Sequence, residues 1–198
     1  MQNPTNRVRE LEKQAAELVI QWKIFSQLFR NPVYDDIFEK SGSTFWLCIR
    51  AYLIDSIFSS ISRFMDPPTS CGNSNLSLKA AIEWDETKPL NEDLTKRLSS
   101  LEKNWSKGIK KWRHKRISHA DLDTIVCGTG LPVIEFQNID ALVAEISAFS
   151  ILILDQIYGE KKNHDIVIHW GVDQVVNYLK LGIAKKDEEL KKIQSEDD

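Results

Sequence analysis

The sequence predicts an all-α fold, a single bundle of five to six helices. Apolar side chains recur every three or four residues along most of the chain, which is the period of amphipathic helices. The 198 residues suit one domain, and the 42% hydrophobic content suffices for one core. Eight glycines and six prolines are too few for a low-complexity or collagen-like chain, and no internal repeat is present.

The first two predicted helices lie before residue 66. Seven apolar residues from Val8 to Phe29 predict the first, and Asn31-Pro32 ends it because proline disfavours a helical residue before it. The second is predicted from about residue 43 to 65. Apolar residues cover most of its circumference, so we expect the central, most buried helix. Its few polar residues follow one stripe: Asp55, Ser59, Ser62 and Asp66.

A turn-rich loop separates these helices from the next pair. The sequence Asp66-Pro67-Pro68 stops the second helix, and turn residues continue to Asn75. A short helix is predicted at about 77–84, and an apolar stripe from Leu90 to Trp112 predicts a longer one.

The helical period is lost at residues 122–137. Two β-prone stretches flank Gly128-Thr129-Gly130, so a small hairpin and an irregular excursion are equally compatible with this region. Ile139 to Ile157 predict a largely buried helix, and a last helix starts near Val172. We therefore place the helical domain at 1–184 and a charged tail, expected to fray, at 185–198.

Positive charge is concentrated in one segment of a chain whose formal net charge is −3. We call residues 103–119 the basic segment. It contains no acidic residue and seven lysines and arginines: Lys103, Lys107, Lys110, Lys111, Arg113, Lys115 and Arg116. The rest of the chain therefore sums to −10, and anionic ligands are the natural partners of this segment.

Other features of the sequence exclude several classes of protein. Three widely spaced cysteines form neither a disulfide framework nor a zinc motif, which favours a reducing, cytoplasmic location. The most apolar stretch, residues 141–154, is interrupted by Glu145 and is shorter than the ~20 residues of a membrane span. No phosphate-binding, dinucleotide-binding, nucleophile-elbow or zinc motif occurs, so no metal, cofactor or membrane partner is expected.

The basic segment contains an arginine and a histidine at a characteristic spacing. Arg113, followed directly by the polar His114, precedes His119 by six positions, which is an R-x5-H motif at a helix end. This resembles the HEPN superfamily, in which a histidine follows an arginine by four to six residues. Residues 61–66 and 75–78 further resemble the abortive-infection, AbiU-like branch of that superfamily.

The resemblance implies a HEPN-type bundle that acts as a metal-independent endoribonuclease of phage-defence or toxin type. It implies RNA as substrate, a homodimer in which two motifs face each other, and an antitoxin protein as a further partner. His119 takes the role of acid and base, because a neutral imidazole suits proton removal from a ribose 2′-OH. Arg113 takes the role of phosphate clamp, because a guanidinium offers forked donors to the phosphorane oxygens.

Further cations are candidates for binding the RNA. Arg113 and His119 lie about 120° apart on a regular helix, so either the helix ends near Arg113 or the two side chains meet across a dimer. Arg116, which aligns better with His119, is the reserve cation. The remaining binding candidates are His114, Lys115, Lys110, Lys111 and Arg63.

Each of these residues also has a structural interpretation. His119 and His114 fit a solvated helix end, and the lysines fit a solvated face. Arg63 fits an internal ion pair as well as a phosphate contact. The polar stripe at 55–66 could approach the site, but it fits better as a satisfied seam on a buried helix. Two alternative functions follow: a HEPN domain that binds RNA or nucleotide without catalysis, and a regulatory module that pairs with another protein.

Overall fold

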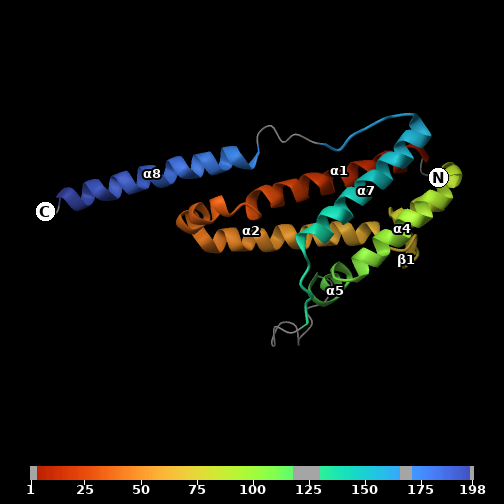
Figure 1. The fold of residues 1–198 in the computed structure, drawn as a ribbon, viewed down its shortest axis with the longest axis horizontal. Helices are drawn as coiled ribbons and strands as arrows, with labels where there is room; N and C mark the ends of the chain where they lie inside the picture. The colour runs from red at the N-terminus through yellow and green to blue at the C-terminus, as the bar shows by residue number, and fades with distance from the viewer. Residues whose placement is uncertain (1–3, 118–129, 166–170, 197–198) are drawn as a thin grey trace. The chain divides into compact units, whose positions relative to one another are not determined.

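Helices dominate the computed structural model, which describes residues 4–117, 130–165 and 171–196 (Figure 1). The α-helices are α1 (Pro4–Phe29), α2 (Asp35–Phe64), α3 (Leu78–Ile82), α4 (Asn91–Ser106), α5 (Ile109–Trp112), α7 (Phe136–Tyr158) and α8 (Val172–Glu196). Shorter elements are the 3-10 turns η1 (Pro32–Tyr34) and η2 (Asp85–Leu90), the π-helical turn η3 (Arg113–Ile117), and the paired strands β1 (Thr69–Ser70) and β2 (Asn73–Ser74). The predicted all-α class is confirmed.

The chain divides into two compact units. Unit 1 comprises Met1–Ile20 and Asp55–Ile166, and unit 2 comprises Gln21–Ile54 and Val167–Asp198. Helices α1 and α2 therefore each contribute residues to both units. The basic segment belongs to unit 1.

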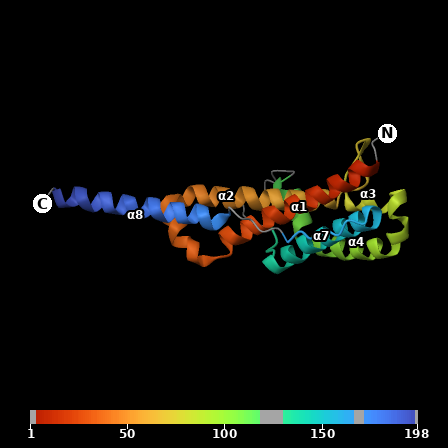
Figure 2. The same cartoon turned by 90° about the horizontal axis from the view of Figure 1, so that it is seen from above.

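Unit 1 is built around the apolar faces of its helices. Helix α7 packs along α4, as both views show (Figures 1 and 2), and η2 contacts both of these helices. Side chains that are at most 1% exposed include Leu11, Ile57, Ile61, Leu94, Leu101, Ile139, Ile146 and Phe149. Ser77 caps α3 by accepting a hydrogen bond from the N–H of Ala80, so a local signal sets where this short helix begins.

Helix α2 departs from the prediction in its first half. It begins at Asp35, with a break at Gly42 (φ +130°), a conformation that favours glycine and explains why the regular pattern starts at residue 43. Phe45, Leu47 and Tyr52 are 59%, 64% and 72% exposed, whereas Ile57 and Ile61 are fully buried. The prediction of the central, most buried helix therefore holds only from about residue 57. Before that, α2 buries Ile37 and Phe38 in the core of unit 2 but leaves Phe45, Leu47 and Tyr52 exposed.

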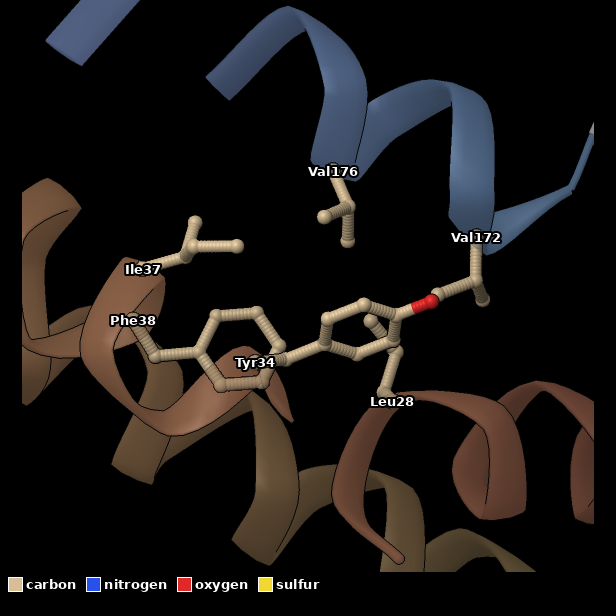
Figure 3. Close-up of a cluster of buried hydrophobic side chains, with 6 residues drawn as sticks. All are labelled: Leu28, Tyr34, Ile37, Phe38, Val172 and Val176. Carbon is tan, nitrogen blue, oxygen red and sulfur yellow. The ribbon is translucent and has the colours of Figure 1, made fainter. Parts of the chain in front are cut away.

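Unit 2 has its own small core. Val172 and Val176 of α8 face Tyr34, Ile37 and neighbouring apolar side chains (Figure 3). The Tyr34 hydroxyl donates to Asp173 Oδ1 at 2.6 Å, and this hydrogen bond, together with burial, raises the pKa of Tyr34.

Helix α8 continues to Glu196, beyond residue 185, where the charged tail was expected to begin.

The region predicted as a hairpin or an irregular excursion is described only in part. Residues 118–129 lie outside the described part of the chain. Residues 130–135 form neither helix nor strand, and α7 begins at Phe136. The hairpin alternative therefore fails for its second arm, because the residues expected there pass directly into a helix.

A buried polar relay attaches the segment after α7 to α1. The ring of His164 lies 2.9 Å from Glu12 Oε1 through Nε2 and 2.8 Å from Ser147 Oγ through Nδ1. Lys162 donates to the other Glu12 oxygen at 3.0 Å. Burial alone raises the pKa of Glu12, but the hydrogen bonds from His164 and Lys162 outweigh it and hold that pKa below its usual value.

In the part of the chain that the structure describes, two helices are long and apolar enough to cross a membrane by length and composition: α2 extended back to Pro32, and α7. Nine residues of α7 are buried within the protein, as in the core helix of a soluble protein, which meets the same criterion.

We expect two substitutions in α2 to distinguish its buried apolar side chains from its exposed ones. Ile61→Ala opens a cavity in a closed core and should lower the free energy of unfolding by about 2–5 kcal/mol. Leu47→Ala removes a largely exposed side chain and should change it by less than about 0.5 kcal/mol. Denaturant unfolding measures the free energy of unfolding of each variant. An equal loss of this free energy in the two variants would show that the Leu47 side chain is buried.

The Glu12 relay should make stability depend on pH in the acidic range. Because the native carboxylate has a lowered pKa, its contribution is present above the usual value of 4.5 and is lost as the pH falls through the native pKa. Glu12→Gln should cost about 1–3 kcal/mol at neutral pH, with the difference from wild type narrowing below pH 4.5. Glu17→Gln, on the exposed face of α1, is the control. Unfolding curves that stay parallel down to pH 3 would refute the role of ionised Glu12.

Candidate functional site

The basic segment is not one continuous helix. Helix α4 ends at Ser106, Gly108 takes a non-helical conformation (φ −150°, ψ −61°), and α5 restarts at Ile109. From Arg113 the chain widens into the π-helical turn η3. The predicted unbroken stripe from Leu90 to Trp112 is therefore wrong at Gly108.

The break at Gly108 accommodates a second segment of the chain. A Cβ atom at position 108 would lie 2.8 Å from Cγ1 of Ile134, a distance that real side chains do not tolerate. Trp112 Nε1 donates to the carbonyl of Pro132 at 2.9 Å. Glycine is therefore needed because residues 132–134 cross the basic segment where a side chain would stand.

Arg113, the predicted phosphate clamp, is held by a carboxylate. Its Nη1 atom donates to Asp66 Oδ1 at 2.5 Å. Asp66 lies just beyond the end of α2. The two side chains are 34% and 23% exposed, so the pair is partly buried and open on one side. A guanidinium held in this way keeps other N–H groups for an anion.

A second ion pair holds the reserve cation. Arg116 Nε lies 3.2 Å from Asp55 Oδ1, and its guanidinium lies over the ring of Trp112, 5.3 Å from the centroid. Trp105 Nε1 also donates to Ser62 Oγ at 3.2 Å. Asp55, Ser62 and Asp66 thus all contact the helices that carry the basic segment. The predicted satisfied seam is satisfied only in part, because Asp55 Oδ1 is buried without a hydrogen-bond partner among the described residues.

The other binding candidates present their charges to solvent in different ways. Lys111 and His114 are exposed, and so is Lys110, whose ammonium lies over the Trp105 ring. Lys115 is half-buried, with its Nζ beside Gly130. Arg63 is exposed and donates to the Ser60 hydroxyl at 2.9 Å. Among the described residues it forms no ion pair with a carboxylate, so the alternative of an internal ion pair is not observed.

His119, the predicted acid and base, lies outside the described residues. The structure therefore brings Arg113 and Arg116 to the α2 stripe and leaves the convergence of Arg113 with His119 a prediction. The 120° separation expected on a regular helix does not apply, because the chain from Arg113 follows a π-helical turn with a wider hydrogen-bonding pattern.

Two functional partners were not assigned from sequence. The sequence favoured a seam for Asp55 and Asp66 over an approach to the site, although their +11 spacing put them on one stripe of α2. That spacing is the signal that could have identified them, because a carboxylate on the face toward a basic helix tends to pair with it. The Glu12–His164 contact joins residues 152 positions apart and leaves no sequence pattern.

The described part of the site offers positive charge and hydrogen-bond donors. It can bind the phosphates of an anionic polymer and stabilise extra charge on one phosphate through Arg113. No group of three or more metal-ligating side chains occurs among the described residues.

Comparison with known proteins places the chain in a family. Residues 1–160 match the family model HEPN_AbiU2, described as AbiU2. Comparison with curated proteins gives no match, and comparison with solved structures gives none either. The match spans 160 of the 198 residues, including α1 to α7 and the whole basic segment, and the chain therefore belongs to the AbiU2 family of HEPN domains.

Proposed function

We propose that this chain is a metal-independent endoribonuclease of phage-defence or toxin type. Family membership supports a HEPN module related to RNA cleavage or abortive infection. The observation that carries the proposal is the Arg113–Asp66 pair at the start of a π-helical turn, among exposed cations. π-helical turns often occur at functional sites, and this one begins at the motif arginine.

The proposed reaction is attack of a ribose 2′-OH on the adjacent phosphate. His119 accepts the hydroxyl proton and returns a proton to the leaving 5′-oxygen, so one residue serves both halves of the transfer. Arg113 donates hydrogen bonds to the phosphate oxygens as their charge increases. The carboxylate of Asp66 holds the guanidinium in one orientation, which reduces the entropy lost when the transition state forms.

The exposed cations supply affinity for the RNA backbone. Lys110 and Lys111 extend the positive surface around Arg113 and Arg116, and the exposed His114 follows Arg113 in the sequence. Such contacts are largely independent of sequence and weaken with salt. The homodimer with facing motifs, the antitoxin partner and the cytoplasmic location belong to the same proposal.

A second function, RNA binding without catalysis, is favoured by one specific observation. Both arginines of the motif region are already paired with carboxylates, Arg113 with Asp66 and Arg116 with Asp55. A phosphate must compete with these carboxylates or share the guanidinium with them. A domain that only binds RNA tolerates such competition, since the lysines provide most of its affinity.

Cleavage of cellular RNA by purified variants in EDTA tests the proposal. Wild type should cleave, His119→Ala should lose about 10²–10⁴ in rate, and Arg113→Ala about 10²–10³. Arg50→Ala, an exposed arginine in unit 2, is the matched control and should cleave as wild type does.

The other outcomes separate the alternatives. Binding of RNA by wild type without cleavage, with affinity that falls as salt rises, would establish the non-catalytic function. Cleavage that survives both substitutions would show that the motif is not the active site.

Asp66→Asn should separate binding from catalysis. The substitution removes a negative charge beside Arg113, so RNA affinity should rise several-fold at low salt, with a steeper salt dependence. The cleavage rate at saturating RNA should fall at least about tenfold, because the guanidinium loses its charged partner and its fixed orientation. Filter binding and single-turnover cleavage measure the two effects.

Glu39→Gln removes the same charge from an exposed position in unit 2 and controls for net charge. A rise in affinity with unchanged cleavage would show that Asp66 does not position the arginine for catalysis.

A further inference from the structure

Unit 2 exposes far more apolar surface than unit 1. Among the residues that the structure describes, ten large hydrophobic side chains are exposed, and all of them except Val133 belong to unit 2. Unit 2 nevertheless comprises only residues 21–54 and 167–198. Exposed apolar side chains that gather on one part of a soluble protein mark an interaction surface.

On α2 the exposed apolar side chains form one stripe. Phe45, Cys48 and Tyr52 recur at positions i, i+3 and i+7, which places them on one face of the helix. All three are exposed, whereas Trp46 and Leu53 pack against the small core of unit 2. This half of α2 is therefore apolar on two faces, and its own unit covers only one of them.

Helix α8 also has one covered and one uncovered apolar stripe. The covered stripe begins with Val172 and Val176, which face the core of unit 2 (Figure 3). Val175, Tyr178 and Leu181 form the other stripe and are 49%, 65% and 68% exposed. Apolar residues on more than one face are typical of a helix that packs against more than one partner.

The second half of α8 has no buried residue. Every residue from 184 to 194 is exposed. Leu190 and Ile193 continue the spacing of three and four residues of the covered stripe, yet they are 47% and 58% exposed. Because a helix without packing partners is only marginally stable in water, this end of α8 also lacks a partner that its own unit does not supply.

We propose that unit 2 binds a second copy of this chain through the two uncovered stripes: Phe45, Cys48 and Tyr52 on α2, and Val175, Tyr178 and Leu181 on α8. We call these residues the unit 2 surface. The inference gives the proposed homodimer an interface outside the basic segment, and it holds whether or not the chain cleaves RNA.

The charge of the unit 2 surface fits a symmetric partner. In a two-fold dimer the same patch is buried on both copies, so it must not repel itself. Arg50 is the one charged residue of the sequence between Ser41 and Ile54, so like charges hardly oppose this contact. A helix that lies on a membrane surface instead carries many lysines and arginines beside its apolar face.

The exposed area also fits a stable dimer. The nine exposed hydrophobic side chains of unit 2 are 47% to 72% exposed. At on the order of 100 Å² for each side chain, they present roughly 800 Å² in all. A stable interface buries about 800 Å² on each partner.

Sedimentation equilibrium of the full chain tests the interface. Wild type should form a dimer, and Tyr52→Glu combined with Leu181→Glu should weaken it at least about thirtyfold, because both changes place a charge within an apolar contact. Both positions are exposed within the chain, so the variant should keep its helical circular-dichroism spectrum. Val133→Glu adds the same charge at the exposed apolar residue of unit 1 and should leave the dimer intact.

Labelling with iodoacetamide, resolved by peptide mass spectrometry, gives a second measurement on wild type itself. Cys48 should react several-fold more slowly in the dimer than after dilution to the monomer, because the second copy covers its thiol. Cys71, which is exposed in unit 1, should react at the same rate in both and is the internal reference.

Three results would overturn the proposal. A wild type that stays monomeric, whether alone, on lipid vesicles or bound to another protein, would show that a second copy does not cover this surface. A dimer that survives the double substitution, or that Arg113→Ala disrupts instead, would show that the copies meet elsewhere. Protection of Cys48 in a monomer would show that the chain covers the surface itself. Neither measurement involves RNA, so loss of this interface and loss of the nuclease remain distinguishable.

Discussion

One polar stripe of α2 holds the basic segment in place, and the geometry of the candidate site depends on it. Asp55 and Asp66 bind the two arginines of the motif region, and Ser62 between them accepts from Trp105. The opposite side of the same half-helix supplies core residues such as Ile57 and Ile61. Partly exposed ion pairs contribute modestly to stability. Here these ion pairs matter because they fix side chains in place. Arg113, for example, is held at the end of α2, a helix that the core immobilises.

This arrangement also sets the electrostatics that an RNA strand would meet. The carboxylates neutralise two of the seven lysines and arginines of the basic segment, while most of the lysines remain exposed. General attraction of the backbone therefore rests on the lysines. The arginines instead present fixed donors whose orientation is set within the protein. A site in which lysines attract the RNA backbone and arginines orient one phosphate would suit both catalysis and specific binding.

The break at Gly108 has an effect beyond the path of the helix. Ile134 occupies the space of a missing side chain, and Trp112 donates to the carbonyl of Pro132. The crossing residues follow 118–129, the part of the chain that contains His119. The same few contacts therefore hold the chain against the basic segment after the motif.

The sequence by itself determined the helical class, the main helices and the basic segment, because these depend on periodicity and local charge. It also marked the polar stripe of α2, since a +4, +7, +11 spacing is a property of one helix. Tertiary structure alone decided which apolar residues of α2 are buried, because Phe45 and Ile57 are equally apolar and differ only in what packs on them. It likewise decided the break at Gly108 and the pairing of Glu12 with His164. These depend on segments distant along the chain, and no local pattern records which segment will approach.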